Sequence, residues 1–251
     1  MKLKNLSLVG LIALSLNSSV FAKVSTTDVS PTSSPISQDE QAQIVAKIRQ
    51  RLSELSTTSA ADTKSIIERA KLSYFIGKYS SKEDDKLKSF RAGLDSLEAA
   101  ATEGKDPDAV LIWAANAGGV ASIERNLDAL KLMDKIEKRL LTLSENFASY
   151  ESGAAYRALA AIYFNAPSFI SVGSGKKAAV YAAKAYALDP NSPANMLMMA
   201  RIEADQGNKT KAVELFREVL QRAKPDRYPL DYAAWHNEAI TGLEDAGAAT
   251  T

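Results

Sequence analysis

The chain has 251 residues, and its 46% hydrophobic and 24% charged residues are ordinary for a soluble protein. Its 31 basic and 30 acidic residues leave no basic excess to neutralise phosphates, which argues against a nucleic-acid-binding role. It contains no cysteine, which excludes disulfides, thiolate metal ligands, cysteine nucleophiles and lipid attachment to an N-terminal cysteine.

The first 22 residues have the features of a secretory signal peptide. Lys2 and Lys4 precede an apolar run from Leu6 to Leu16, and Ala22 provides a small residue before the cleavage point. A membrane anchor is the less favoured alternative, because the run has about half of the roughly 20 residues that a spanning helix needs. We therefore expect residues 1–22 to be removed on export, leaving a periplasmic protein with no membrane anchor.

The rest of the chain divides into three parts. Residues 23–36 are rich in Ser, Thr, Val and Pro, which is typical of a flexible leader. Residues 37–246 form the predicted helical domain, which opens with a Ser-x-x-Glu capping box at Ser37 and Glu40. Residues 247–251 form a loose tail.

Apolar residues recur at helical spacing throughout this domain, and no segment alternates in the manner of a strand. Glycine, proline and capping residues divide the pattern into one leading helix, four helical hairpins and a closing helix. The expected helices begin near residues 37, 63, 81, 106, 126, 152, 175, 194, 209 and 230. The leading helix is expected to end near Leu55, with a polar break from Ser56 to Asp62.

The segment from residue 173 to residue 219 repeats itself after 34 residues. The aligned pairs are Gly173 and Gly207, Ala178 and Ala212, Ala182 and Phe216, and Ala185 and Val219. A helix-turn-helix unit of about 34 residues is typical of tetratricopeptide repeat (TPR) arrays, whose hairpins stack because none can bury its apolar face alone. The fold class that we expect is all-α: a right-handed solenoid of stacked antiparallel hairpins with a leading and a capping helix.

The region before the repeat carries a further resemblance. Tyr156, Leu159, Ala160 and Tyr163 match the first helix of a TPR hairpin, and about six residues, Pro167 to Val172, are inserted before its second helix. Together with Gly93-Leu94 and the run from Ile112 to Asn116, this insertion resembles the T component of TRAP transporters. The resemblance covers about Leu87 to Leu220.

That resemblance implies an all-helical periplasmic protein with cryptic TPR hairpins, which partners the solute-binding protein of the transporter. Members of that family are commonly lipoproteins, and this chain has no cysteine to acylate.

No catalytic or metal-binding constellation stands out, so we expect no enzyme activity, metal or cofactor. His236 is the only histidine and has no second histidine at helical spacing. Gly173–Lys177 lacks the first glycine and the Ser or Thr of a phosphate-binding loop, and no strand precedes it. Lys82–Lys88 lacks the alternating oxygen ligands of a calcium loop and is better explained as a solvated helix start.

The better candidate is the concave face of the array, where a peptide or an anionic amphiphile could bind to two arginines and neighbouring apolar groups. The candidate residues are Arg157, Phe164, Asn165, Leu197, Arg201, Asp205 and Phe169. The alternative is that Arg201 and Asp205, four residues apart, pair with each other. Trp113, Asn116 and Trp235 are interpreted as packing residues.

Two functions follow from these features. The first is a scaffold whose groove binds a partner protein or peptide, the solute-binding protein of a transporter being one such partner. The second is a carrier of a small organic or amphiphilic ligand, with Phe169 and Ile170 of the inserted loop closing over an apolar pocket. The sequence leaves the oligomeric state open, a homo-oligomer included.

Overall fold

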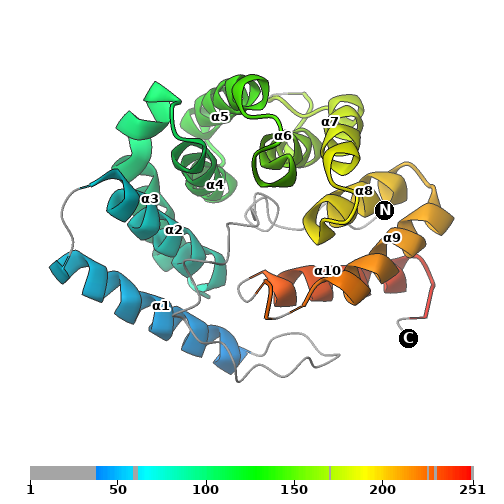
Figure 1. The fold of residues 1–251 in the computed structure, drawn as a ribbon, viewed down its shortest axis with the longest axis horizontal. Coiled ribbons are helices and arrows are strands. Elements are labelled where there is room, and N and C mark those ends of the chain that lie inside the picture. The colour runs from blue at the N-terminus through cyan, green and yellow to red at the C-terminus, as the bar shows by residue number, and fades with distance from the viewer. Residues whose placement is uncertain (1–37, 59–61, 170, 225, 229–230, 250–251) are drawn as a thin grey trace.

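The computed structural model describes residues 38–58, 62–169, 171–224, 226–228 and 231–249. Within these ranges the regular structure consists of ten α-helices and one short 3₁₀ helix, and no strand is present (Figure 1). The predicted signal peptide, the flexible leader and the capping-box residue Ser37 lie outside the described residues. None of the described helices is long and apolar enough to cross a membrane.

The helices form two layers that curve around a centre (Figure 1). The inner layer consists of α2 (Thr63–Tyr79), α4 (Pro107–Glu124), α6 (Ala154–Asn165), α8 (Pro193–Asp205) and α10 (Tyr232–Asp245). The outer layer consists of α3 (Glu83–Glu103), α5 (Leu127–Asn146), α7 (Gly175–Leu188) and α9 (Lys209–Arg222). The leading helix α1 (Gln38–Thr58) packs against α2, and the short helix η4 (Tyr150–Ser152) precedes α6.

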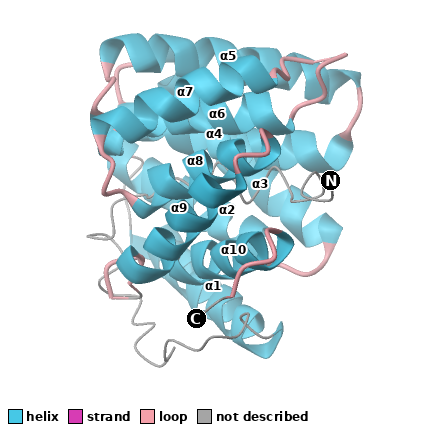
Figure 2. Ribbon diagram, turned by 90° about the vertical axis from the view of Figure 1, so that its right-hand side faces the viewer, coloured by secondary structure: helices cyan, strands magenta, loops and turns pink. Residues whose placement is uncertain are grey.

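Each helix packs against the next along the chain, and α2 with α4, α6 with α8, and α8 with α10 also make contact. Figure 2 shows the resulting stack, with the helix axes running across the view. This arrangement confirms the predicted all-α fold of stacked antiparallel hairpins.

Burial differs between the two layers. In the inner layer, every residue of α4 from Ala109 to Ala121 is buried, whereas α7 and α9 of the outer layer each bury a single stripe. The stripes consist of Ala178, Ala182 and Ala185 on α7, and of Ala212, Leu215, Phe216 and Val219 on α9. The positions that the 34-residue repeat aligns on these two helices are therefore the ones that face the core.

Several helix starts follow the predicted signals. The Asp106 carboxylate accepts hydrogen bonds from the backbone N–H groups of Asp108 and Ala109, and Asn126 caps α5 through the N–H of Ala129. The start predicted at Ser81 was two residues early, because α3 begins at Glu83 and Lys82 at its N-cap makes no capping bond. Asp84 and Asp85 lie in its first turn, where negative charges interact favourably with the helix dipole.

Two other boundaries were wrong. The leading helix continues to Thr58 instead of ending near Leu55, since its Ser and Thr residues extend the last turn without breaking it. The helix expected from Ser152 begins at Ala154, because a left-handed turn at Glu151, Ser152 and Gly153 interrupts the chain first. The last helix was expected to begin near residue 230 and begins at Tyr232.

Candidate functional site

The turn between α5 and α6 is the most strained described backbone. Glu151, Ser152 and Gly153 all have positive φ angles, of 46°, 56° and 81°. Only the glycine adopts this conformation without a steric penalty, and each of the other two residues costs about 1–2 kcal/mol. Because strain of this kind persists only where the surroundings enforce it, and concentrates at functional sites, the turn marks a place to look for function.

Arg157 and Asn195 hold this turn in place. Nη1 of Arg157 on α6 donates to Oδ1 of Asn195 on α8 at 2.7 Å, and also to the carbonyl oxygens of Glu151 and Ser152. Nδ2 of Asn195 donates to the same Ser152 carbonyl at 3.0 Å. The Ser152 hydroxyl donates to Oδ2 of Asp189 at 2.7 Å, so the turn is tied to the C-terminal end of α7 as well as to α6 and α8.

Charged side chains from α2 and α4 interact electrostatically with this turn. Lys71 of α2 is buried, and burial lowers its pKa, while the carboxylates of Asp108 and Glu151 act in the opposite direction. Burial raises the pKa of Glu151, and the nearby negative charge of Asp108 adds to the effect. Burial also lowers the pKa of Arg157 to about 10, which leaves the guanidinium charged at neutral pH.

A buried ion pair joins the two ends of the inner layer. Nζ of Lys78 on α2 lies 2.8 Å from Oδ1 of Asp231, the residue before α10, and the two side chains are 6% and 7% exposed. Burial alone would lower the pKa of Lys78, but the charge of Asp231 outweighs it, and the pKa is raised. The first and last inner helices are thereby linked across the centre of the arc.

Six charged side chains are connected by this ion pair and by the electrostatic interactions around the turn. We call these six residues the polar hub. It consists of Lys71, Lys78, Asp108, Glu151, Arg157 and Asp231. Three cations and three carboxylates balance, so the hub has no formal net charge while every side chain is ionised. An arrangement of this kind can orient a ligand that carries both a charged group and hydrogen-bonding atoms.

The structure places the predicted groove residues in several different environments. Arg157 belongs to the polar hub, and Leu197 is buried within α8. Arg201 is also buried, and its Nε donates to Oε1 of Glu238. The alternative pairing of Arg201 with Asp205 was wrong, because α10 packs against α8 and supplies Glu238, while Asp205 is exposed.

The remaining groove residues lie at the far end of α6. Phe164 is half-buried, and Nδ2 of Asn165 donates to the Ala161 carbonyl at 2.6 Å. Seven residues separate Phe164 from Arg157, which is about 10 Å along a helix. Phe169 is 98% exposed, and Ile170 lies outside the described residues. The seven candidates are thus not brought into one site, and their role in binding stays a prediction.

Sequence reasoning missed most of the polar hub. Lys71 stands between apolar neighbours in Ala70-Lys71-Leu72, and Asn195 lies in an Ala- and Met-rich run. A polar residue within an apolar helical run was the available signal for both residues. No sequence pattern predicted that Asp231 would return to α2.

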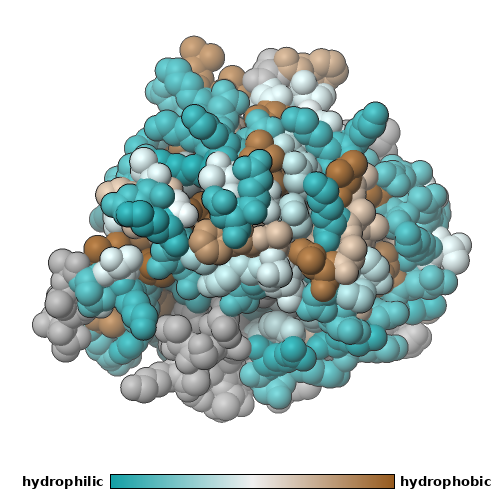
Figure 3. Space-filling model, turned by 45° about the horizontal axis from the view of Figure 1, so that its top comes forward, coloured by the Kyte–Doolittle hydropathy of each residue, from teal (hydrophilic) through white to brown (hydrophobic). Residues whose placement is uncertain are grey.

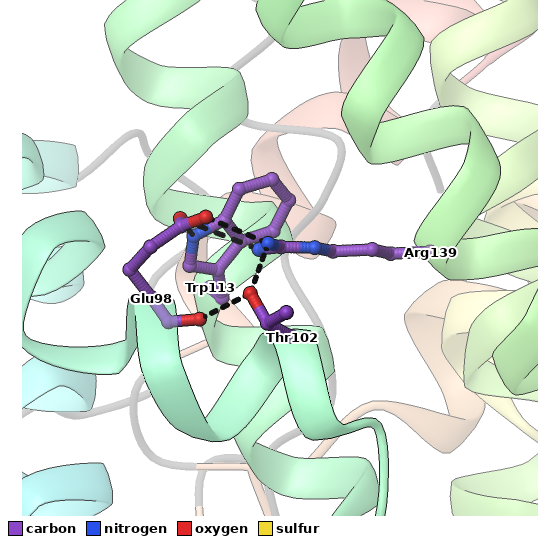
Figure 4. Close-up of polar contacts among 4 residues, drawn as sticks. All are labelled: Glu98, Thr102, Trp113 and Arg139. Atoms are coloured by element: carbon purple, nitrogen blue, oxygen red, sulfur yellow. Dashed lines mark hydrogen bonds and ion pairs between the residues drawn. The ribbon is translucent and has the colours of Figure 1, made fainter.

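The expected packing residues are buried, and Trp113 links three helices. Its Nε1 donates to Oε2 of Glu98 on α3 at 2.7 Å, and Arg139 on α5 lies over its ring (Figure 4). Nη2 of Arg139 also donates to Oε1 of Glu98 and to the Thr102 hydroxyl. Asn116 donates from Nδ2 to the carbonyl oxygens of Ala70 and Ile112. These groups serve packing within the first two hairpins.

Comparison with known proteins adds no relative. No model of a known protein family matches the chain, and no curated protein is similar to it in sequence. The resemblance to TPR proteins and to transporter T components therefore stays a prediction. In the part of the chain that the structure describes, no three side chains of the metal-ligating types converge.

Proposed function

We propose that this protein is a non-enzymatic scaffold of TPR-like hairpins, which binds a partner protein or peptide at the inner face of its arc. The observation that carries the proposal is the polar hub beside the strained turn at Glu151 and Ser152. Burying four charged groups and half-burying two more lowers stability, as does the left-handed backbone of Glu151 and Ser152. Replacing buried ion pairs by apolar residues is often neutral or stabilising. A binding role explains why this chain carries them.

The hub supplies the groups that peptide recognition uses. Arg157 is buried and holds the turn, and Lys71 is buried beside it. The half-buried carboxylates of Asp108 and Glu151 are therefore the hub groups that a segment on the inner face can reach, and they can accept hydrogen bonds from its amide N–H groups. All four lie on inner elements, α2, the first turn of α4, η4 and α6, so an elongated segment would contact several hairpins at once.

The cellular setting extends the same proposal. The predicted signal peptide favours the periplasm, and the resemblance to transporter T components favours a periplasmic solute-binding protein as the partner. Under this proposal the protein is an accessory of solute transport and needs no catalytic group of its own.

Affinity capture from periplasmic extract tests the binding site directly. The chain from Lys23 onward is compared with Lys71→Met, and with Lys64→Met as a control on the exposed part of the same helix. Lys71→Met should retain at least about tenfold less partner, because it removes the cation that acts on the Asp108 and Glu151 carboxylates, and one hydrogen bond to a charged group contributes about 1.5–3 kcal/mol. Equal retention by both variants, with unchanged thermal stability, would refute the hub as the binding site.

A carrier of a small anionic amphiphile is the second candidate. Buried apolar groups of α8, such as Leu197 and Met198, lie on the same inner layer as Arg157. The predicted closure by Phe169 finds no support, because that side chain is almost fully exposed. Native mass spectrometry of protein purified from its own cells distinguishes the two: a retained small molecule favours the carrier.

A further inference from the structure

The outer surface of the third hairpin differs from the rest of the described surface. Of the four large apolar side chains that the structure exposes, three belong to this hairpin. Phe169 in the α6–α7 loop is 98% exposed, and Val180 and Leu188 on α7 are 48% and 46% exposed. Scattered single apolar residues need no explanation, but three on one hairpin indicate a contact surface.

The charge of this hairpin is equally one-sided. No Asp or Glu occurs from Ser152 to Leu188, while the same stretch contains Arg157, Lys176, Lys177 and Lys184. The outer helices α3, α5 and α9 all carry charges of both signs. The exposed side of α7 is therefore basic, whereas the other outer helices carry both positive and negative charges.

Helical spacing brings the exposed lysines and apolar residues together. Lys177, Val180, Lys184 and Leu188 follow one another at intervals of three, four and four residues, so they form one exposed stripe along α7, separate from the stripe of buried alanines. Nζ of Lys184 lies 4.9 Å from the ring centroid of Tyr181. Nζ of Lys177 lies 3.1 Å from Oε1 of Glu137 on α5, so its charge is partly compensated.

The loop that carries Phe169 is anchored at both ends. The Ser174 N–H donates to the Tyr163 carbonyl at 2.8 Å, and the Ser171 N–H donates to the Pro167 carbonyl at 3.1 Å. Gly173 packs so closely on the Ala166 carbonyl that a Cβ at that position would collide with it. The loop thus holds an almost fully exposed aromatic ring in the segment that leads into α7.

From these features we propose that the outer face of α7, with Phe169, docks reversibly on an anionic lipid surface. We define this α7 face as Phe169, Lys176, Lys177, Val180, Lys184 and Leu188. It lies on the convex side of the arc, where a flat bilayer can reach it (Figure 1). Figure 3, which brings the side of α5 and α7 forward, shows hydrophobic groups standing among hydrophilic ones.

Lipid chemistry explains this composition better than a soluble partner does. Interfacial helices combine lysines, which contact anionic headgroups, with aromatic and aliphatic groups that enter the headgroup boundary. Each lysine near such a surface strengthens binding about fivefold. A bilayer favours one sign of charge along the whole contact, and the chain has no carboxylate from Ser152 to Leu188, the pairing of Lys177 with Glu137 of α5 being the exception on this side. A protein partner would require complementary charges at particular positions only.

Vesicle sedimentation tests the proposal. The chain from Lys23 onward, which retains every described helix, is mixed with vesicles of equal phosphatidylglycerol and phosphatidylcholine, and with vesicles of phosphatidylcholine alone. Wild-type protein should sediment with the anionic vesicles, weaken as salt is raised, and stay in solution with the neutral ones. Lys176→Glu/Lys184→Glu should lower the partition coefficient at least about 25-fold.

Two matched measurements keep the test specific. Lys64→Glu/Lys209→Glu changes the net charge equally on exposed positions of α2 and α9 and should lower the partition coefficient less than about threefold, because distant charges are screened. Phe169→Trp should show emission quenching by brominated lipid, which the buried Trp113 and Trp235 should not.

Three results would overturn the lipid proposal. They are wild-type protein that stays in solution with anionic vesicles, equal losses in the two charge-reversal variants, and a Trp at position 169 that brominated lipid does not quench. If a protein captured from extract is lost with Lys176→Glu/Lys184→Glu while vesicles are not bound, the α7 face is a protein docking site instead. Partner capture through the polar hub is scored separately, so either proposal can fail alone.

Discussion

The guanidinium carbon of Arg139 lies 3.8 Å from the centroid of the Trp113 ring, and the two side chains share Glu98 as a hydrogen-bond acceptor (Figure 4). The three residues come from α5, α4 and α3, so this cluster ties the first two hairpins together. Because the Trp113 ring is fully buried and Arg139 is largely so, the cation–π contact is partly shielded from water.

We predict that Arg139→Ala lowers the free energy of unfolding by about 2–4 kcal/mol. The cation–π contact contributes about 1–2 kcal/mol and the charged hydrogen bond to Glu98 about 1.5–3 kcal/mol, and the two are not fully additive. Urea denaturation measures the change, with Lys138→Ala on the exposed side of the same helix as the control. A loss no greater than that of the control would show that the cluster contributes little.

Gly119 should gain no stability from replacement by alanine. A Cβ at Gly119 would lie 2.6 Å from Cγ of Phe90, whose ring is fully buried between α2, α3 and α4. Alanine gains about 1 kcal/mol of helix propensity over glycine, but overpacking a buried ring costs about 1–3 kcal/mol. We therefore expect Gly119→Ala to be neutral or destabilising by up to about 2 kcal/mol.

Gly175 provides the matched control for this substitution. Gly175 is also a helical residue, the first of α7, and a Cβ there would meet no atom within 4 Å. Gly175→Ala should therefore be neutral or stabilising by up to about 1 kcal/mol in thermal melts. Stabilisation of equal size by both alanines would mean that the Phe90 ring can move aside.

The helices could be predicted from the sequence because local signals determine them. Asp106 followed by Pro107 is a start signal whose capping bonds form as expected, and the buried alanines of α7 follow the 34-residue repeat. A glycine pair within a helical run, such as Gly118-Gly119, indicates either a close backbone approach or a local break. It is a close approach, because α4 continues through it and Gly119 meets Phe90.

The polar hub could not be predicted in the same way, because long-range closure creates it. Lys78 and Asp231 meet only when the whole inner layer curves, and no local pattern encodes that curvature. Arg201 shows the same limit. Its helical spacing to Asp205 suggested a local pair, but the packing of α10 against α8 supplied Glu238.

The ion pair between Lys78 and Asp231 should be costly to break on one side. Lys78→Met and Asp231→Asn should each lower the free energy of unfolding by about 3–5 kcal/mol, because each leaves a buried charge without its partner. Lys78→Met/Asp231→Asn removes both charges and should lose less than the sum of the two single variants. Urea denaturation of all four proteins gives the coupling energy, and additive losses would contradict a direct pair.

The pH dependence of this pair follows from the sign of its shift. Because the folded-state pKa of Lys78 is raised, its contribution is fully present below the unfolded pKa and is lost only as pH rises through the folded value. The pair should therefore contribute equally at pH 6 and pH 8. Any change in stability across that range belongs to other groups.

Glu151 should make the free energy of unfolding depend on pH near the pKa of its carboxyl group. Burial raises its pKa in the folded state, so the favourable effect of protonation is present below the unfolded pKa and is lost as pH rises through the folded value. Glu151→Gln keeps the shape of the side chain and removes the titration. We expect the variant to match the wild type near pH 4 and to become the more stable protein as the pH approaches 7.

Thermal melts of both proteins at pH 4, 5, 6 and 7 measure this difference, and titrations common to the two cancel. The contribution of the nearby cations can be separated in the same experiment. If Lys71 and Arg157 stabilised the Glu151 carboxylate more than burial destabilises it, the wild type would gain on the variant as pH rises. That opposite slope would show that the hub is built to keep Glu151 ionised, and would require a different account of the strained turn beside it.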